Sequence, residues 1–151
     1  MSTNAKATNY KYGVQLDKNG DGGLTDERFV PGLRFTKEFD TFAAADVGKC
    51  IFTAPAACKV VRVTERHGTS AGQAGTIQLE KVPSGTAAGS GTVLLSSAID
   101  AAGTTDTNQV KTALTTGVEK LDSGDSLALK TASGALTSLA NATITIVLEW
   151  L

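Results

Sequence analysis

The sequence predicts an all-β protein, a β-sandwich of the jelly-roll type that follows an extended N-terminal arm. The first observation is the C-terminal segment, residues 143–151, in which apolar and polar residues alternate almost without interruption. A period of two with many β-branched residues is typical of a half-buried strand. The second observation is that similar segments recur upstream, between loops rich in Gly, Ser and Thr. Because strand order is not visible in a sequence, an immunoglobulin-like or β-tulip sandwich fits the same pattern.

Length and composition indicate an ordinary globular domain. The chain has 151 residues, of which 41% are hydrophobic, a size at which a core forms without metal or disulfide staples. The net charge is −1, from 14 basic and 15 acidic residues, so the basic surface of a nucleic-acid-binding protein is not expected. The polar start does not resemble a signal peptide, and no segment approaches the ~18 apolar residues of a transmembrane helix. We therefore expect cytoplasmic synthesis and no membrane partner.

Residues 1–48 differ from the rest, and we expect an extended arm that leads into a first strand near Arg34–Phe42. Charged residues are frequent there, and clean periodicity is lacking. The isolated aromatic residues that we expect to act as anchors are Tyr10, Tyr12, Phe29 and Phe35. Single large rings leave water only where they find pockets, so such an arm usually lies across a neighbouring molecule or its own domain. The remaining residues, 49–151, are predicted to form the sandwich.

The strands of the sandwich are predicted from local patterning and from turn residues. They are expected at Lys49–Thr53, Cys58–Arg66, Gly75–Val82, Gly91–Ser96, Gln109–Thr115, Ser126–Thr131 and Thr143–Leu151. In the third strand, Ile77 and Leu79 are expected to point inward, whereas Gln78 and Glu80 are expected to point outward. Residues 68–75 are expected to close a hairpin between the second and third strands, and residues 122–125 to form a turn. No long amphipathic helix is predicted.

The two cysteines, Cys50 and Cys58, fit a reducing compartment. Their simplest interpretation is as two small buried hydrophobic residues. Pro55 between them implies a turn, which leaves open a disulfide across adjacent strands. Zinc is not expected, because it needs further ligands and His67 is the only histidine.

The most specific local motif is an acidic, Gly-rich segment that matches the first part of an EF-hand-like calcium loop. Its candidate oxygen ligands are Asp17, Asn19, Asp21, the backbone carbonyl of Gly23 and Thr25. Gly22 would provide the sharp turn, but the twelfth position is Arg28, where such a loop needs a bidentate Glu. Two interpretations therefore stay open, a calcium site and an acidic surface turn without a cofactor.

Catalytic motifs are scarce, and no enzyme activity is predicted. The sequence has no Gly-x-Ser-x-Gly elbow, no phosphate loop and no His-Glu-x-x-His. His67 is expected to be a surface residue at a strand end, because no Ser or Cys partner is evident. The basic residues around Arg62 and Arg66 are interpreted as a solvated sheet face, because acidic residues dilute them.

The second half of the chain resembles the head decoration, or cement, proteins of tailed bacteriophages. The segments that carry this resemblance are Gly75–Val82, Ala87–Ser96, Ser97–Thr105 and Leu121–Lys130. The resemblance implies a structural virion protein that is synthesised in the host cytoplasm and binds the outer capsid surface as a homotrimer. It would cement adjacent copies of the major capsid protein, and ligands that bind only an assembled state stabilise that state. The arm anchors Tyr10, Tyr12, Phe29 and Phe35 would then contact the capsid or a neighbouring subunit.

Two other functions stay open on the sequence alone. One is a carbohydrate- or receptor-binding module of a phage fibre, although sugar sites usually use exposed aromatic platforms and the sandwich segment has few aromatic residues. The other is a component of the phage tail or neck, which would assemble as a ring rather than a trimer.

Overall fold

The computed structural model describes residues 8–10, 13–15, 33–41, 46–136 and 138–151. The chain divides into two compact units, Met1–Gly32 and Leu33–Leu151. In the first unit, strands β1 (Thr8–Tyr10) and β2 (Gly13–Gln15) pair antiparallel. The second unit contains all the other strands and is described below by itself.

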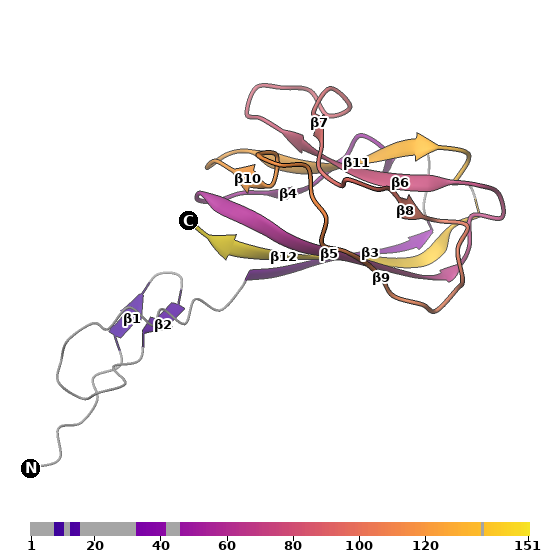
Figure 1. The fold of residues 1–151 in the computed structure, drawn as a ribbon, viewed down its shortest axis with the longest axis horizontal. Coiled ribbons are helices and arrows are strands. Elements are labelled where there is room, and N and C mark those ends of the chain that lie inside the picture. The colour runs from indigo at the N-terminus through magenta and orange to yellow at the C-terminus, as the bar shows by residue number, and fades with distance from the viewer. Residues whose placement is uncertain (1–7, 11–12, 16–32, 42–45, 137) are drawn as a thin grey trace, which may run out of the picture. The chain divides into compact units, whose positions relative to one another are not determined.

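The second unit consists of two antiparallel sheets, each of five strands (Figure 1). The first sheet, here called the β12 sheet, contains β3 (Leu33–Thr41), β5 (Cys58–Thr69), β9 (Gln109–Lys111), β10 (Lys120–Leu121) and β12 (Ala140–Trp150). Its order is β10-β5-β12-β3, and β9 also pairs with β5. The second sheet, here called the β11 sheet, contains β4 (Cys50–Thr53), β6 (Thr76–Val82), β7 (Thr92–Val93), β8 (Ile99–Asp100) and β11 (Ser126–Ser133).

The order of the β11 sheet is β4-β11-β6-β7, and β8 also pairs with β6. The described residues contain no α-helix, so the all-β prediction is confirmed. In that same part of the chain, no helix has the length and apolar character needed to cross a membrane.

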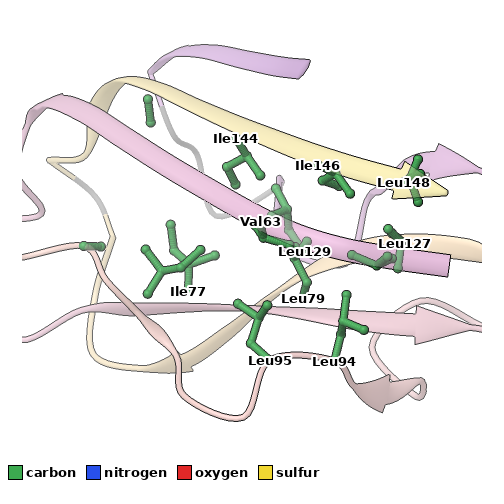
Figure 2. Close-up of a cluster of buried hydrophobic side chains, with 14 of the residues drawn as sticks. Val63, Ile77, Leu79, Leu94, Leu95, Leu127, Leu129, Ile144, Ile146 and Leu148 are labelled. Atoms are coloured by element: carbon green, nitrogen blue, oxygen red, sulfur yellow. The ribbon is translucent and has the colours of Figure 1, made fainter. Parts of the chain in front are cut away.

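The core lies between the two sheets (Figure 2). The inward row of β12 consists of Ala142, Ile144, Ile146 and Leu148, each at most 1% exposed, so the predicted alternation is confirmed. Leu79, Leu127 and Leu129 point inward from the β11 sheet. Each fully buried Leu or Ile contributes about 1.5–3 kcal/mol of transfer free energy. The packing of aliphatic side chains across two sheets therefore accounts for a stable fold with few aromatic residues.

The segment between β5 and β6 corrects one prediction. Residues 68–75 do not close a hairpin, because β5 belongs to the β12 sheet and β6 to the β11 sheet. The chain instead crosses from one sheet to the other. A crossing and a hairpin use the same turn residues, and only the pairing partners, which lie far along the chain, distinguish them.

The outer face of β6 corrects a second prediction. Gln78 and Glu80 alternate with the inward Ile77 and Leu79, yet Gln78 is 7% exposed and Glu80 is fully buried. The following segment folds over them: the Gln78 amide donates to the carbonyl of Leu95 at 3.0 Å and accepts from its N–H at 3.1 Å. Polar residues on the outward side of β6 are thus covered by their own loop.

The first strand of the sandwich was expected near Arg34–Phe42, and β3 spans Leu33–Thr41. It pairs with β12 from Leu33 to Thr41, so it is part of the sandwich. Phe35 is half-buried against the core, and its ring lies 5.4 Å from that of Phe52 on β4. This pair of rings packs the edge of one sheet against the edge of the other.

The cysteines are both free thiols. Cys58 is buried on β5, as expected of a small hydrophobic residue, and burial, aided by the charge of Asp125, raises its pKa. Cys50 lies exposed on β4, which corrects its interpretation as a buried residue. The two strands belong to different sheets and are not neighbours.

Candidate functional site

The outer face of the β12 sheet carries a regular row of side chains in register across β3, β12 and β5. On β12, Thr143, Thr145 and Val147 alternate with the buried core row and are half-buried. Val147 lies in register between Arg62 on β5 and Arg34 on β3, both exposed. The face therefore has a centre of Thr and Val with guanidinium groups on both sides.

The size of this face can be worked from its register. The pairing of β12 with β3 runs from Ala140 to Leu148, which is about 30 Å of strand, and four adjacent strand positions span about 19 Å. The face thus covers roughly 600 Å², against ~800 Å² per partner in a standard protein–protein interface. A face of this size is smaller than one side of a standard protein–protein interface.

The edge of the β12 sheet offers a second mode of contact. β3 has nine residues and, among the described strands, pairs only with β12. Its far edge presents backbone N–H and C=O groups to a further strand, which is how extended peptides add to sheets. Charged side chains on this strand, including the exposed Arg34 and Glu38, oppose unspecific pairing.

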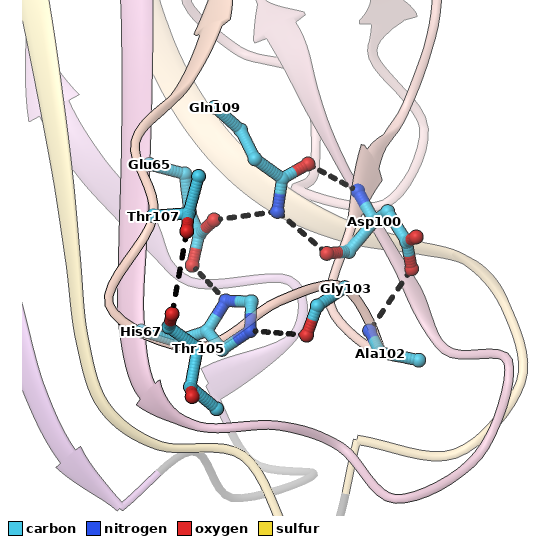
Figure 3. A network of polar contacts seen from close by, with 8 residues as sticks. All are labelled: Glu65, His67, Asp100, Ala102, Gly103, Thr105, Thr107 and Gln109. Carbon is cyan, nitrogen blue, oxygen red and sulfur yellow. Dashed lines mark hydrogen bonds and ion pairs between the residues drawn. The ribbon is translucent and has the colours of Figure 1, made fainter.

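A buried polar network fixes the loop after β8 (Figure 3). After Val63, the inward row of β5 continues with Glu65 and His67, and both are fully buried. The Nδ1 of His67 lies 2.9 Å from Oε1 of Glu65, and its Nε2 lies 3.3 Å from the carbonyl of Gly103. The prediction of His67 as a surface residue is therefore wrong. Polar side chains can be buried at this end of the inward row of β5 because residues 99–109 supply their hydrogen-bond partners.

The network continues through Gln109 on β9. Its Nε2 donates to Oε2 of Glu65 at 3.0 Å and to the carbonyl of Asp100 at 2.6 Å, and its Oε1 accepts from the N–H of Asp100 at 2.9 Å. Burial raises the pKa of Glu65, although hydrogen bonds from His67 and Gln109 oppose this. Both nitrogens of the His67 ring face oxygen atoms of the protein itself. The arrangement holds residues 99–109 in place.

A second buried carboxylate fixes the loop after β6. Glu80 accepts from the backbone N–H of Gly89 and, at 3.1 Å, from that of Gly91. Lys130 on β11 lies 3.6 Å from Glu80 and donates to the carbonyl of Gly89 at 3.3 Å. Hydrogen bonds to charged groups are about twice as strong as neutral ones, so residues 83–91 are held to the sheet despite their small side chains.

The residues predicted from sequence are distributed as follows. Tyr10 lies in β1, of which the structure describes the backbone. Phe35 packs into the protein's own core, which accounts for its burial without an external partner. The other predicted residues lie outside the described part of the chain: Tyr12, Phe29, Asp17, Asn19, Asp21, Gly23 and Thr25. Within the described residues, no group of three or more His, Cys, Asp or Glu side chains is placed to hold a metal ion.

The buried network was missed by sequence reasoning. The sequence does contain a signal for it. Val63, Glu65 and His67 are spaced by two residues, so on a strand they lie on the same face, and Val63 is a core residue. Comparisons with protein-family models, curated proteins and solved structures found no match.

Proposed function

We propose that this chain is a structural virion protein that binds the outer surface of a tailed-phage capsid. It cements adjacent major capsid subunits as a homotrimer, and its sandwich is of the jelly-roll type. The observation that carries the proposal is the outer face of the β12 sheet, where Thr and Val side chains of β12 lie in register with exposed Arg residues of β3 and β5. Such a surface suits a broad contact with another protein lattice, and the resemblance of residues 75–151 to decoration proteins supports the same function.

Multivalency supplies the affinity that a single face lacks. One face of roughly 600 Å² is below standard interface size, but a trimer presents three of them to one lattice. Once one subunit is bound, the others bind intramolecularly, and the apparent affinity rises by about 10²–10⁴. Because only the assembled shell offers all three sites in register, binding stabilises the assembled shell.

The N-terminal unit would supply further contacts. Its aromatic residues at positions 10, 12 and 29 are expected to fill pockets on the capsid or on a neighbouring subunit. The sugar-binding alternative is disfavoured, because Phe52 and Trp150 both pack against the core of the sandwich and are not free to form a platform.

Deletion of residues 1–32 tests the role of the N-terminal unit. The deletion must end there, because β3 begins at Leu33 and Phe35 belongs to the core. We expect an unchanged circular dichroism spectrum for the sandwich and a loss of binding to capsid shells prepared without this protein. Full occupancy by the deleted chain would contradict the proposed role of this unit.

Val147→Lys tests the outer face. A lysine there places a hydrated ammonium at the centre of the contact, while its flexible stem leaves the fold intact. We expect capsid binding to weaken about tenfold or more. Ala132→Lys, at an exposed residue of β11 in the other sheet, is the control and should bind normally. Equal binding by both variants, or a map of the native particle without this chain on its outer surface, would refute the proposal.

A further inference from the structure

A hollow of about 400 Å³ lies where the segment between β9 and β10 bows away from β5. β9 pairs with β5 at Val63–Glu65 and β10 at Cys58–Lys59, so the intervening residues leave the sheet edge and return to it. The hollow is lined by Lys59, Val60, Val61, Thr112, Leu114, Thr116, Glu119 and Glu149. Its volume falls within the range of sites for small molecules or single side chains.

A β-bulge forms the floor of the hollow. The register between β12 and β5 shifts at Val147/Leu148, which pair with Arg62 and Val60, so Val61 is the extra residue. Val61 is 36% exposed as a result. Bulges re-aim side chains and are over-represented at functional sites. Here the bulge turns an apolar side chain toward the hollow.

The opposite wall is held rigidly. Leu114 forms an isolated β-bridge with Leu95, and the N–H of Thr115 donates to the carbonyl of Leu94 at 2.8 Å. The carbonyl of Glu119 accepts from the N–H of Val60 at 2.8 Å. The hollow is thus a built feature with both walls fixed to the sandwich.

The charged side chains at the hollow form no ion pairs with one another or with other described residues. The Oε2 of Glu119 is buried and has no hydrogen-bond partner in the described part of the chain. Lys59 and Glu149 lie in register on β5 and β12, yet no ion pair or hydrogen bond joins either side chain to another described residue. A buried carboxylate oxygen without a partner is costly and calls for a donor. Two carboxylates and one ammonium leave a formal charge of −1, which a single cation would neutralise.

We propose that this hollow receives an arginine side chain of the partner protein, which, resting on the function proposed above, is a capsid subunit. The aliphatic stem would lie on Val61 and Leu114, as long basic side chains do on apolar surfaces. The planar guanidinium would donate to Glu119 and Glu149 from its fixed fork of N–H groups. Arginine is favoured over lysine because it is less strongly hydrated and reaches two carboxylates at once.

The guanidinium site is tested without any capsid. The probe is arginine acetylated at its amine and methylamidated at its carboxyl, and the neutral control is the same derivative of citrulline, which has the same shape. In heteronuclear NMR spectra, we expect arginine to shift the amide signals of residues 59–61 and 112–119 at millimolar concentration. Glu119→Gln should weaken this binding about tenfold or more, whereas Glu38→Gln, which removes an exposed carboxylate from the far end of the same sheet, should leave it unchanged. The proposal would be overturned if the citrulline derivative bound as well as the arginine derivative, or if the shifted amide signals belonged to residues outside the hollow.

Capsid binding tests the partner. Glu119→Gln should lower capsid occupancy, whereas Asp46→Asn, in the segment before β4 that is hydrogen-bonded to β11, should not. If arginine binds the hollow but Glu119→Gln leaves occupancy unchanged, the capsid subunit is not the partner. If the wild-type chain binds arginine but no capsid, the proposed function fails and the guanidinium site stands. A last outcome concerns self-association, which sedimentation velocity measures. If added arginine disrupts it, a second copy of this chain supplies the side chain, and the assignment to the capsid is overturned.

Discussion

Replacement of Glu65 by Leu should destabilise the protein, whereas replacement by Gln should not, because only Gln can keep the hydrogen bonds of the buried network. Leu keeps most of the volume but leaves the Nδ1 of His67 and one donor of Gln109 without a partner. Each unsatisfied buried group costs ~1–3 kcal/mol, so Glu65→Leu should lower the free energy of unfolding by about 4 kcal/mol. Gln can keep both contacts, because its amide N–H can donate to Nδ1 of His67 while its oxygen accepts from Gln109. Glu65→Gln should therefore be close to the wild type.

The assay is urea denaturation followed by the fluorescence of Trp150, the only tryptophan, which packs against the core. With a slope of ~2 kcal/mol per molar urea, the Leu variant should unfold at a midpoint about 2 M lower, with the slope unchanged. A Leu variant whose free energy of unfolding lies within ~1 kcal/mol of the wild-type value would refute this account of the network, because the difference would be smaller than the error of such comparisons. So would a Gln variant as unstable as the Leu variant.

The same pair of proteins tests the pH dependence. Burial raises the pKa of Glu65 in the folded state above its ordinary value of 4.5. A carboxyl with a raised pKa binds its proton more tightly when folded, so its contribution to stability is present below that ordinary value and is lost as the pH rises through the folded pKa. Glu65→Gln should therefore gain stability relative to the wild type as the pH rises from 4 to 8. A relative gain for the wild type over that range would contradict the burial argument.

Three further predictions concern other parts of the sandwich. Phe35→Ala should lower the free energy of unfolding by about 2 kcal/mol, roughly half the value for a fully buried Phe, because its ring contacts Phe52 and is half-buried; urea denaturation measures this. Glu80→Gln should speed hydrogen exchange in residues 83–91 about tenfold or more, because its carboxylate holds two backbone N–H groups of that loop. Burial raises the pKa of Asp125, but a backbone N–H and Lys81 outweigh this effect and lower it below the ordinary value of 3.8. The stabilisation of the fold by ionised Asp125 should therefore be lost as the pH falls below 3.8, and Asp125→Asn should not show this pH dependence.

The sequence predicts where the strands of the sandwich lie better than it predicts which strands pair with each other. The alternation in β12 predicts a strand with one buried face, and Ile144, Ile146 and Leu148 lie in the core as expected. Local patterning does not say which strands are neighbours, and this is why the crossing between β5 and β6 was interpreted as a hairpin. Pairing is determined by contacts between residues far apart in the chain, such as Leu129 and Leu79 across β11 and β6.

The candidate site could be predicted in part. Thr143, Thr145 and Val147 follow directly from the alternation in β12, so one row of the outer face is readable. The arginines that flank it could not be assigned to this face without the register of β3 and β5. The hollow depends on a bulge at Val61 and on a loop held at both ends, and neither leaves a local sequence signal.

The buried charges explain how a chain rich in Gly, Ala, Ser and Thr can present a defined surface. The nine residues of the loop 83–91 would lose roughly 9–18 kcal/mol of backbone entropy if they became ordered only on contact with a partner. Glu80 and Lys130 hold this loop in the isolated sandwich, and Glu65 and His67 do the same for residues 99–109. That entropy is therefore lost on folding rather than on binding, and more of the contact energy appears as affinity. If this reasoning is correct, loosening either loop by removing its buried charge should weaken capsid binding even though the charge itself never touches the capsid.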